Sequence, residues 1–345
     1  MMNLSYRPLS LKLRHTFKIA RETRSIQDNI VVELKDEDGI SGLGEAAPTS
    51  FFGESILSVA AVCNESTDVL KNADPFQTED ITRSLANKFP GNSAARAAID
   101  IALHDIVGKK LKIPLYKLLG LNRTGEKATS FTIGIDTLEK MCEKVDEVKD
   151  FSILKIKVGI KNDIEILKEL RKITKAIFRV DANTGWTVDE AIKKLNIMEE
   201  LGVELVEQPF PIGNILSLRG IRDRVKIPVF ADEDVKNAGD IPAISGVVDG
   251  INIKLMKCGG IREALRMIHT ARAHNLKVMI GCNIESSLSI TAAAHLISLV
   301  DYVDLDGHLL VTNDPYLGVT VDKGKLLLPE GNGLGVVKRN VWETA

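Results

Sequence analysis

The sequence predicts an α/β protein built on a modified (β/α)₈ barrel of the TIM type, preceded by an N-terminal α+β capping domain. Three observations lead to this fold class. The chain has 345 residues, more than one average domain. Its first third changes from extended to helical hydrophobic spacing. The remainder alternates short β-rich runs with helical segments, and eight such runs can be counted.

Residues 1–122 form the predicted capping domain. Residues 4–45 have the pattern of a small antiparallel meander with a turn at 36–39. Residues 54–119 then carry apolar residues at helical spacing, with a break at Pro114. Together these elements predict an α+β domain, which by itself indicates no activity.

Residues 123–320 form the predicted barrel, and residues 321–345 are expected to return to the capping domain as a hairpin and loop. A helix over 187–201 opens with a capping box, whereas an eighth barrel helix is only weakly indicated. A doubly wound sheet would give the same alternation, but it favours a G-x-G-x-x-G turn that the sequence lacks. The expected strands cover residues 129–133, 153–158, 177–181, 203–207, 229–232, 251–256, 278–282 and 302–306.

Composition limits the partners of the chain. Lys and Arg number 45 against 47 Asp and Glu, and no basic stretch is interleaved with aromatic residues, so nucleic acid is not expected as a partner.

The N-terminal residues have no signal-peptide pattern and no run suits a membrane span, so a cytoplasmic protein is expected. The four cysteines are scattered, which favours reduced thiols. Capped barrels often associate, and the sequence leaves a homo-oligomer open.

Carboxylates recur at the ends of consecutive predicted strands. Asp181, Glu207 and Asp232 end the third, fourth and fifth strands, at the barrel face where active sites are built. Three carboxylates buried together without a cation would be strongly destabilising. Oxygen ligands without Cys or His suit a hard divalent ion, so we assign the three residues to one Mg²⁺, with Mn²⁺ as the second choice.

Lysines are expected on both sides of this metal. Alternation directs Lys155 and Lys157 of the second strand into the barrel, and Lys254 stands on the opposite sixth strand. Two opposed amines suit removal of a proton α to a carboxylate on one face and its return on the other. Repulsion from Lys155 and the metal are both expected to lower the pKa of Lys157. Lys257 competes with Lys254, but alternation places it on the other face or in the following loop, where it could support the site.

An interior lysine could instead form a Schiff base, as in barrel aldolases. The carboxylate triad makes this alternative less favourable, because such an enzyme needs no metal site.

The chain resembles the enolase superfamily, in its muconate lactonizing subgroup, over essentially its full length. The resemblance implies a capping domain over a modified barrel, Mg²⁺ on the three carboxylates, and Lys157 and Lys254 as the acid/base pair. It rests on the segments 98–105 (AIDIALHD), 114–120 (PLYKLLG), 155–157 (KIK), 180–183 (VDAN), 206–209 (VEQP), 231–233 (ADE) and 252–260 (NIKLMKCGG).

Within that subgroup, Asp304 and Asp306 are similar to the Asp-x-Asp pair with which dipeptide epimerases clasp the α-ammonium group of the substrate. Two carboxylates beside a bound cation also have an independent physical reason, since they offset its charge and accept its hydrogen bonds. Family position further implies that Thr132, Cys282 and Ile284 line the substrate pocket, although each could equally be barrel packing.

The resemblance departs at the specificity loop. Family members that act on L-Ala-D/L-Glu hold the distal carboxylate with an Arg after a Phe-Lys pair, and alignment places Glu22 at that position. Glu22 would repel an acidic side chain unless Arg21 or Arg24 takes over. We therefore expect an Ala-Xaa dipeptide epimerase whose second residue is small, hydrophobic or uncharged polar, as in Ala-Ala; a cationic residue is the second choice.

Three other functions remain open from the sequence. A muconate-type cycloisomerase or an o-succinylbenzoate synthase could use the same scaffold. A non-catalytic metal-binding barrel is less favoured, because it leaves both lysines unexplained.

Overall fold

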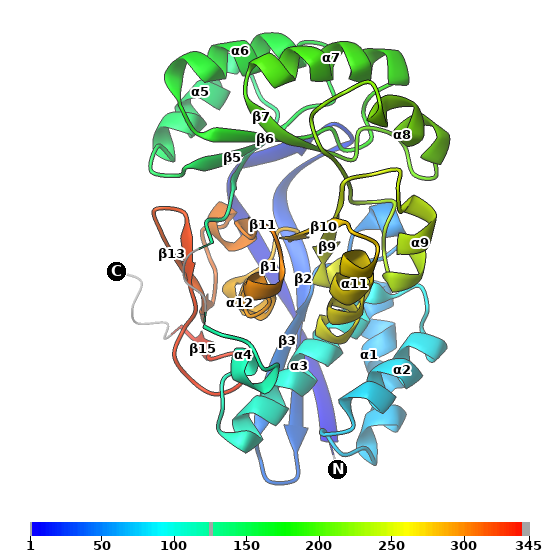
Figure 1. Ribbon diagram of the computed structural model, residues 1–345. Helices are drawn as coiled ribbons and strands as arrows, with labels where there is room; N and C mark the ends of the chain where they lie inside the picture. The colour runs from blue at the N-terminus through cyan, green and yellow to red at the C-terminus, as the bar shows by residue number, and fades with distance from the viewer. Residues whose placement is uncertain (1, 124–126, 340–345) are drawn as a thin grey trace.

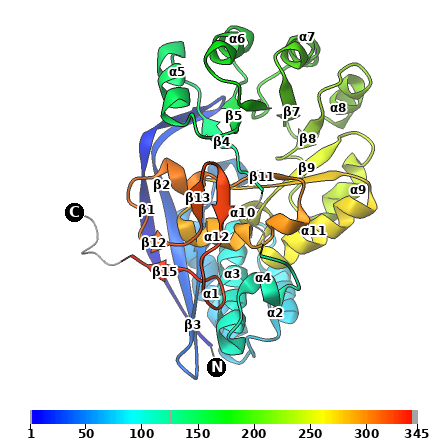
Figure 2. The same cartoon turned by 60° about the vertical axis from the view of Figure 1, so that its left-hand side comes forward.

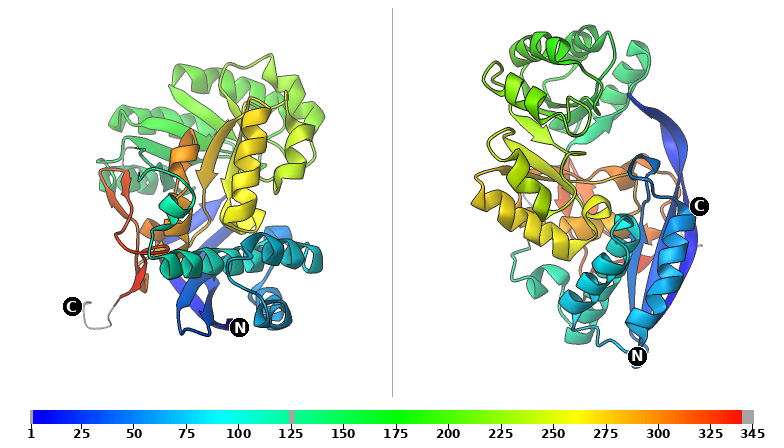
Figure 3. Two further views of the ribbon diagram at one scale, coloured as in Figure 1. Left: turned by 60° about the horizontal axis from the view of Figure 1, so that its bottom comes forward. Right: turned by 90° about the vertical axis from the view of Figure 1, so that its right-hand side faces the viewer.

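A computed structural model describes residues 2–123 and 127–339 of the chain. Its N-terminal part is a three-stranded antiparallel sheet in the order β1–β2–β3, with helices packed on one face (Figures 1 and 3). The strands are β1 (Met2–Ile19), β2 (Glu22–Asp36) and β3 (Ser41–Ala46), and the helices are α1 (Ile56–Lys71), α2 (Thr78–Lys88), α3 (Ser93–Leu111) and α4 (Leu115–Leu118), with a 3₁₀ turn η1 (Ser50–Phe52).

Helix α3 is the centre of this domain, because almost all of its side chains are buried. Strand β3 approaches it closely at Gly42 and Gly44, where any side chain would collide with the carbonyl groups of Ala102 and Ala98. Asp100 of α3 also joins the domain to the barrel, because its Oδ2 accepts a hydrogen bond of 2.5 Å from the backbone of Ile261. Helix α3 therefore contacts the barrel directly.

The second part contains a sheet of eight parallel strands in sequential order, β4 to β11. The N–H of Ser130, just before β4, donates to the carbonyl of Val303 in β11 at 3.2 Å, so the first and last strands are also in contact. All eight expected strands are present: β4 (Phe131–Ile133), β5 (Ile153–Lys157), β6 (Ile177–Asp181), β7 (Val203–Glu207), β8 (Val229–Ala231), β9 (Gly250–Lys254), β10 (Lys277–Gly281) and β11 (Tyr302–Asp304). The predicted barrel is thereby confirmed.

Helices surround these strands (Figures 1 and 2). The predicted capping box at Thr187 and Glu190 is present, with both of its hydrogen bonds formed. Only a 3₁₀ turn, η4 (Gly307–Leu310), follows the eighth strand, which explains the weak helix signal there. The helices are α5 (Leu138–Glu147), α6 (Asp163–Ile173), α7 (Val188–Glu200), α8 (Ile215–Arg222), α9 (Ile241–Ile244), α10 (Leu255–Cys258), α11 (Ile261–Ala273) and α12 (Ser287–Ala294), with 3₁₀ turns η2 (Ala238–Asp240) and η3 (Ile297–Leu299).

The chain then returns toward the first domain. Strands β13 (Thr320–Asp322) and β14 (Lys325–Leu327) form a hairpin, and β12 (Tyr316–Leu317) pairs with β15 (Val337–Lys338). The carbonyl of Gly333 accepts a 2.7 Å hydrogen bond from the backbone of Leu115. Parts of the predicted domain junction and C-terminal segment, residues 124–126 and 340–345, lie outside the described residues.

The barrel interior has two regions. Leu205, Phe230 and Met279 pack together with Tyr302 in one apolar cluster inside the ring of strands. Charged side chains occupy the carboxyl ends of the strands, as the alternation of side chains requires. The far end of the β1–β2 hairpin extends to this side of the barrel, where the carbonyl of Lys18 accepts a hydrogen bond from Ile135 at 2.8 Å (Figure 2). A pocket thus forms between hairpin and barrel.

Candidate active site

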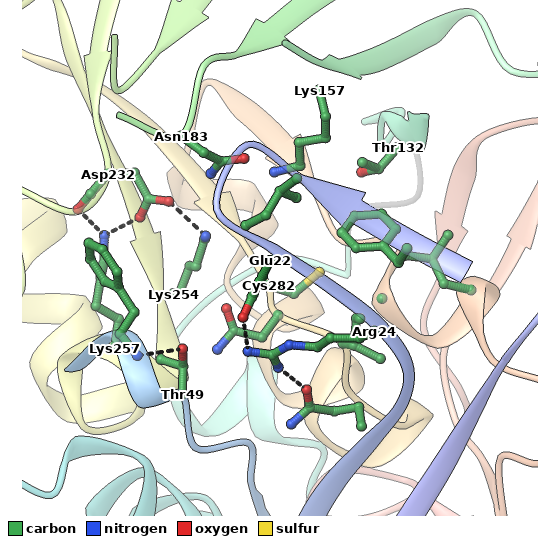
Figure 4. Close-up of a pocket in the computed structure, with 18 of the residues that line it drawn as sticks. Glu22, Arg24, Thr49, Thr132, Lys157, Asn183, Asp232, Lys254, Lys257 and Cys282 are labelled. Atoms are coloured by element: carbon green, nitrogen blue, oxygen red, sulfur yellow. Dashed lines mark hydrogen bonds and ion pairs between the residues drawn. The ribbon is translucent and has the colours of Figure 1, made fainter. Parts of the chain in front are cut away.

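The pocket has a cavity volume of about 100 Å³ and joins the two parts of the protein. The capping domain contributes the hairpin tip and the turn at Phe51 and Phe52. The barrel contributes side chains from the ends of at least five strands (Figure 4). The predicted site residues that line it are Glu22, Thr132, Lys155, Lys157, Asp232, Lys254, Cys282, Ile284, Asp304 and Asp306.

Strand β5 directs its two lysines into the barrel, since Leu154 and Ile156, which alternate with them, are buried on its other face. Lys157 Nζ lies 2.6 Å from Asp181 Oδ2. Lys155 Nζ lies 3.2 Å from Asp181 and 2.7 Å from both Glu207 Oε2 and Asp304 Oδ2. Burial would lower the pKa of Lys155, but these three carboxylates raise it well above its usual value. Lys155 is therefore a fixed positive charge.

Asp181 and Glu207 are register partners on β6 and β7, and both are fully buried. Burial and the adjacent charge of Asp181 raise the pKa of Glu207 to about 8. Asp181 titrates in the opposite direction: burial would raise its pKa, but Lys157 and Lys155 hold it below its usual value. Asp181 and Glu207 therefore cannot both ionise freely, which indicates that the site has too little positive charge to balance its carboxylates.

Asp232 follows β8 and is held between two lysines (Figure 4). Its Oδ2 lies 2.7 Å from Lys254 Nζ, and its Oδ1 lies 2.6 Å from Lys257 Nζ. Burial would lower the pKa of Lys254, yet Asp232 and Glu207 outweigh it and raise the pKa above its usual value. Lys254 is consequently protonated while these carboxylates face it without another cation.

The carboxylates suit a hard cation by their chemistry. Within residues 2–123 and 127–339, no group of three or more His, Cys, Asp or Glu side chains is arranged as a ready-made metal site, because lysines pair with the carboxylates. Glu207 Oε2 is buried, with the ammonium group of Lys155 2.7 Å away. The pKa of Glu207 is raised to about 8 although Lys155 lies beside it, so the carboxylates lack positive charge, and their oxygens fit a divalent cation that binds oxygen ligands.

The Asp pair of the eighth strand faces the same pocket. Asp304 Oδ1 accepts a 2.6 Å hydrogen bond from Ser130, and Asp306 Oδ2 accepts one of 2.6 Å from the backbone N–H of Thr132. Burial and the charge of Asp304 raise the pKa of Asp306 to about 6. Asp304 has Lys155 beside it, whereas Asp306 has no ion pair among the described residues. The pair can thus accept one further cationic group.

The other predicted contacts lie around this pair. Thr132, Cys282 and Ile284 line the pocket, and Cys282 Sγ lies 3.4 Å from the carbonyl oxygen of Asp304. Burial raises the pKa of the Cys282 thiol well above its usual value, so it is a neutral wall group and not a thiolate nucleophile.

The specificity loop carries its own charge balance. Glu22 Oε2 lies 2.6 Å from Arg24, whose other terminal nitrogen donates to the side-chain oxygen of Gln27 (Figure 4). Arg21 points elsewhere: it pairs with Glu233 at 2.7 Å and lies over the ring of Phe51, 3.9 Å from its centre. Arg24 therefore neutralises Glu22, and Arg21 joins the capping domain to the barrel.

Several residues that complete the site have no role predicted from the sequence. Asn183 lines the pocket, adopts a positive φ of 42°, and leaves Oδ1 without a hydrogen bond among the described residues. Asn252 Nδ2 donates to Glu207 Oε1 at 2.8 Å. The signal for Asn252 was available, since it lies two residues before Lys254 on the same strand and so shares its face; Asn183 lies beyond the end of β6, where alternation no longer applies. Glu233 offered no such signal, because its partner Arg21 lies in the other domain.

Comparisons with known proteins agree with this geometry. The L-Ala-D/L-Glu epimerase of Bacteroides thetaiotaomicron is 41% identical over 339 residues, covering 98% of this chain and 88% of that protein. The L-Ala-D/L-amino acid epimerase of Flavobacterium johnsoniae is 37% identical, covering 97% of this chain and 99% of that protein. The crystal structure of the dipeptide epimerase from Cytophaga hutchinsonii, complexed with Mg and D-Ala-L-Val, has a TM-score of 0.94 at 29% identity, covering 98% and 96% of the two chains.

Both parts of the chain also match families. Residues 3–120 match the N-terminal domain of mandelate racemase/muconate lactonizing enzyme, and residues 137–340 match the Enolase C-terminal domain-like family. The predicted resemblance to the enolase superfamily is thereby confirmed. This chain belongs to the mandelate racemase/muconate lactonizing enzyme family.

Proposed function

We propose that the protein is a Mg²⁺-dependent dipeptide epimerase that inverts the α-carbon of the C-terminal residue. One observation carries this proposal: Lys157 and Lys254 enter one pocket from opposite strands, and the same pocket contains Asp304 and Asp306. An isomerase of this kind needs two bases for the proton and one anionic site for the substrate ammonium. Relatives named as epimerases of L-Ala dipeptides support the same reaction.

Asp181, Glu207 and Asp232 would hold the Mg²⁺. When bound, the ion supplies positive charge that stabilises negative charge developing on the substrate carboxylate. The three residues come from β6, from β7 and from the position just after β8, consecutive strands whose carboxyl ends share one edge. Asn252 holds Glu207 in place through its 2.8 Å hydrogen bond.

The two lysines exchange the α-proton. One neutral amine removes the proton from the substrate α-carbon, and the opposite ammonium returns a proton to the other face of the planar carbanion. The lysine that acts as base must first lose its proton, so its ion pair with Asp181 or Asp232 must weaken when the site is filled. Lys155 remains protonated and supplies a fixed positive charge to the surrounding carboxylates.

Asp304 and Asp306 bind the α-ammonium group of the first residue. A charge-assisted hydrogen bond to a carboxylate contributes roughly 1.5–3 kcal/mol. This contact fixes the peptide so that its C-terminal α-carbon lies between the lysines. Substrates without an amine would leave the pair unsatisfied, which disfavours the cycloisomerase and succinylbenzoate functions.

The second residue faces Glu22. Arg24 is engaged by Glu22 and Gln27, and Arg21 by Glu233, so each arginine already has an acceptor. We infer that Ala followed by a small, hydrophobic or uncharged polar residue is preferred, with a cationic residue as the second choice. The named relatives differ in their second residue, which supports a specificity set by such loop contacts.

Helices long and apolar enough to cross a membrane are absent from the described part of the chain. We place the enzyme in the cytoplasm, where its four cysteines would stay reduced.

Deuterium exchange tests the function. The protein is incubated in D₂O with a pooled library of L,L dipeptides, with Mg²⁺ and with EDTA, and incorporation is measured by mass. Metal-dependent exchange at the C-terminal α-carbon of Ala-led neutral dipeptides is expected, and it is lost or becomes one-sided in Lys157→Ala and Lys254→Ala. Silence across the whole library would reject the proposal.

A further inference from the structure

A second cavity of about 550 Å³ adjoins the catalytic pocket. The two share Phe17, Thr132 and Leu310 as a common wall. The second cavity lies between the cap hairpin, the first barrel unit with β4 and α5, and the β13–β14 hairpin. Ligand sites are usually 300–1,000 Å³ in volume, so the catalytic pocket alone is small and its neighbour has the size of a binding site.

The shared wall stands directly beside the ammonium site. Thr132 donates its backbone N–H to Asp306 at 2.6 Å, and Leu310 ends the 3₁₀ turn η4 that begins just after Asp306. In a dipeptide, the first α-carbon carries both the ammonium group and the first side chain. An ammonium held at Asp306 therefore places that side chain at the shared wall.

Part of the lining of the second cavity is apolar. Phe131 and Phe151 pack edge to face with ring centres 5.1 Å apart, and Val148 and Val321 add aliphatic surface. Its charged lining residues carry both signs, with Arg14, His15, Lys144 and Lys323 on one side of the balance and Glu147 and Asp150 on the other. His15 lies 2.9 Å from Glu147, and Lys144 lies 2.9 Å from Asp136. The apolar part suits a hydrophobic or aromatic group, and the mixed charges around it favour neither sign of charge.

We propose that this cavity receives a large apolar side chain from the first residue of the dipeptide. The inference rests on the proposed function and extends it: the substrate class includes Leu-led and Phe-led dipeptides in addition to Ala-led ones. A leucine or phenylalanine side chain passes the shared wall between Phe17, Thr132 and Leu310 and gains binding free energy by burying its apolar surface.

Two substitutions that fill the cavity test this inference. Val148→Phe and Val321→Phe enlarge residues that line the second cavity and not the catalytic pocket. The measured quantity is kcat/KM for Leu-Ala and Phe-Ala divided by kcat/KM for Ala-Ala, so the second residue is constant. We expect wild-type turnover of all three substrates, and a fall of about tenfold or more in both ratios in each variant, because loss of room for one or two methylenes changes specificity by that factor.

Leu327→Phe is the matched control, since Leu327 lies on the same C-terminal hairpin, is 44% exposed and lines neither cavity. Its ratios should equal those of the wild type. Turnover of Ala-Ala without turnover of Leu-Ala or Phe-Ala would overturn the inference and leave the proposed function intact. An equal decrease in kcat/KM for all three substrates in Val148→Phe and Val321→Phe would also overturn the inference. Absence of turnover on Ala-Ala as well would reject both.

Discussion

Lys157 and Lys254 present their amino groups to one pocket, and each is held by a different carboxylate of the predicted metal site. Lys157 Nζ is 2.6 Å from Asp181 Oδ2, and Lys254 Nζ is 2.7 Å from Asp232 Oδ2. The strands that carry them, β5 and β9, are four places apart in a ring of eight. The bases and the metal ligands are therefore coupled, because a cation on the carboxylates competes with both lysines.

Removal of either lysine should stop epimerisation but preserve exchange of the α-proton in one of the two stereoisomers. We expect Lys157→Ala and Lys254→Ala each to lower epimerisation by about 10²–10⁴-fold, the range for loss of one acid/base group. Each variant should still exchange the α-proton of the one stereoisomer that faces its remaining lysine. Deuterium incorporation into L,L and L,D substrates measures this. Lys172→Ala, at a 67% exposed side chain, is the control; equal residual exchange with both stereoisomers would contradict two-base inversion.

Lys155 should contribute most to the stability of the protein when no metal is bound. Its amino group contacts Asp181, Glu207 and Asp304, so Lys155→Met leaves three buried carboxylates without that charge. Breaking a buried ion pair on one side typically destabilises a protein by about 3–5 kcal/mol. We expect a lower Tm in EDTA and a larger rise in Tm on adding Mg²⁺ than in the wild type. Thermal unfolding with and without Mg²⁺ measures this. The same rise in Tm on adding Mg²⁺ in both proteins would argue against Lys155 and the metal neutralising the same carboxylates.

The sequence predicted the barrel because its strands repeat regularly and their ends carry the charged residues. Alternation along β5 correctly directed Lys155 and Lys157 to one face. For Lys257, alternation left open the other face of the strand or the following loop, from where it could support the site. Strand β9 ends at Lys254, and the helical turn α10 returns Lys257 to Asp232.

Contacts between the domains escaped prediction for a related reason. The pairing of Arg21 with Glu233 depends on how the cap hairpin docks onto the barrel, and a local pattern contains no information on docking. The second cavity is likewise formed by segments far apart in the chain, so only the folded structure brings its walls together.

Asp306→Asn should weaken binding of substrates that carry a free amine. The change removes the charge but keeps an oxygen that can accept from Thr132. Loss of one charge-assisted contact, about 1.5–3 kcal/mol, corresponds to a decrease in kcat/KM of roughly 10–100-fold. An N-acetylated dipeptide has no ammonium group and should lose less. Steady-state kinetics on the two substrates distinguish the cases, and equal losses would show that Asp306 acts in another way.

Glu22 should control the charge of the second residue. Glu22→Gln removes the partner that holds Arg24 at 2.6 Å, so Arg24 becomes available to an acidic side chain. We expect kcat/KM for Ala-Glu to rise about tenfold relative to Ala-Ala, with the opposite trend for Ala-Lys. In Arg24→Ala, Glu22 loses its counter-ion, and the ratio for Ala-Glu should fall. If the kcat/KM ratios are unchanged in both variants, the side chain of the second substrate residue does not contact this loop.

Glu285 should make stability depend on pH. It is buried between β10 and α12, where it accepts hydrogen bonds from Ser289 Oγ at 2.5 Å and from the N–H of Asn283 at 2.7 Å. Burial nevertheless raises the pKa of Glu285 from 4.5 to about 7. The folded state thus binds the proton more tightly than the unfolded state, so the stabilisation is fully present below about pH 4.5 and is lost as pH rises through 7.

Glu285→Gln removes this linkage and retains an amide oxygen as an acceptor. As pH rises from 4.5 to 7.5, the free energy of unfolding of the variant should therefore increase relative to that of the wild type, by up to about 3 kcal/mol. Urea denaturation at the two pH values measures the difference. Glu139→Gln, at an exposed position of α5, is the matched control. A constant difference between wild type and Glu285→Gln across this range would mean that the buried carboxyl keeps the same protonation in the folded and unfolded chains.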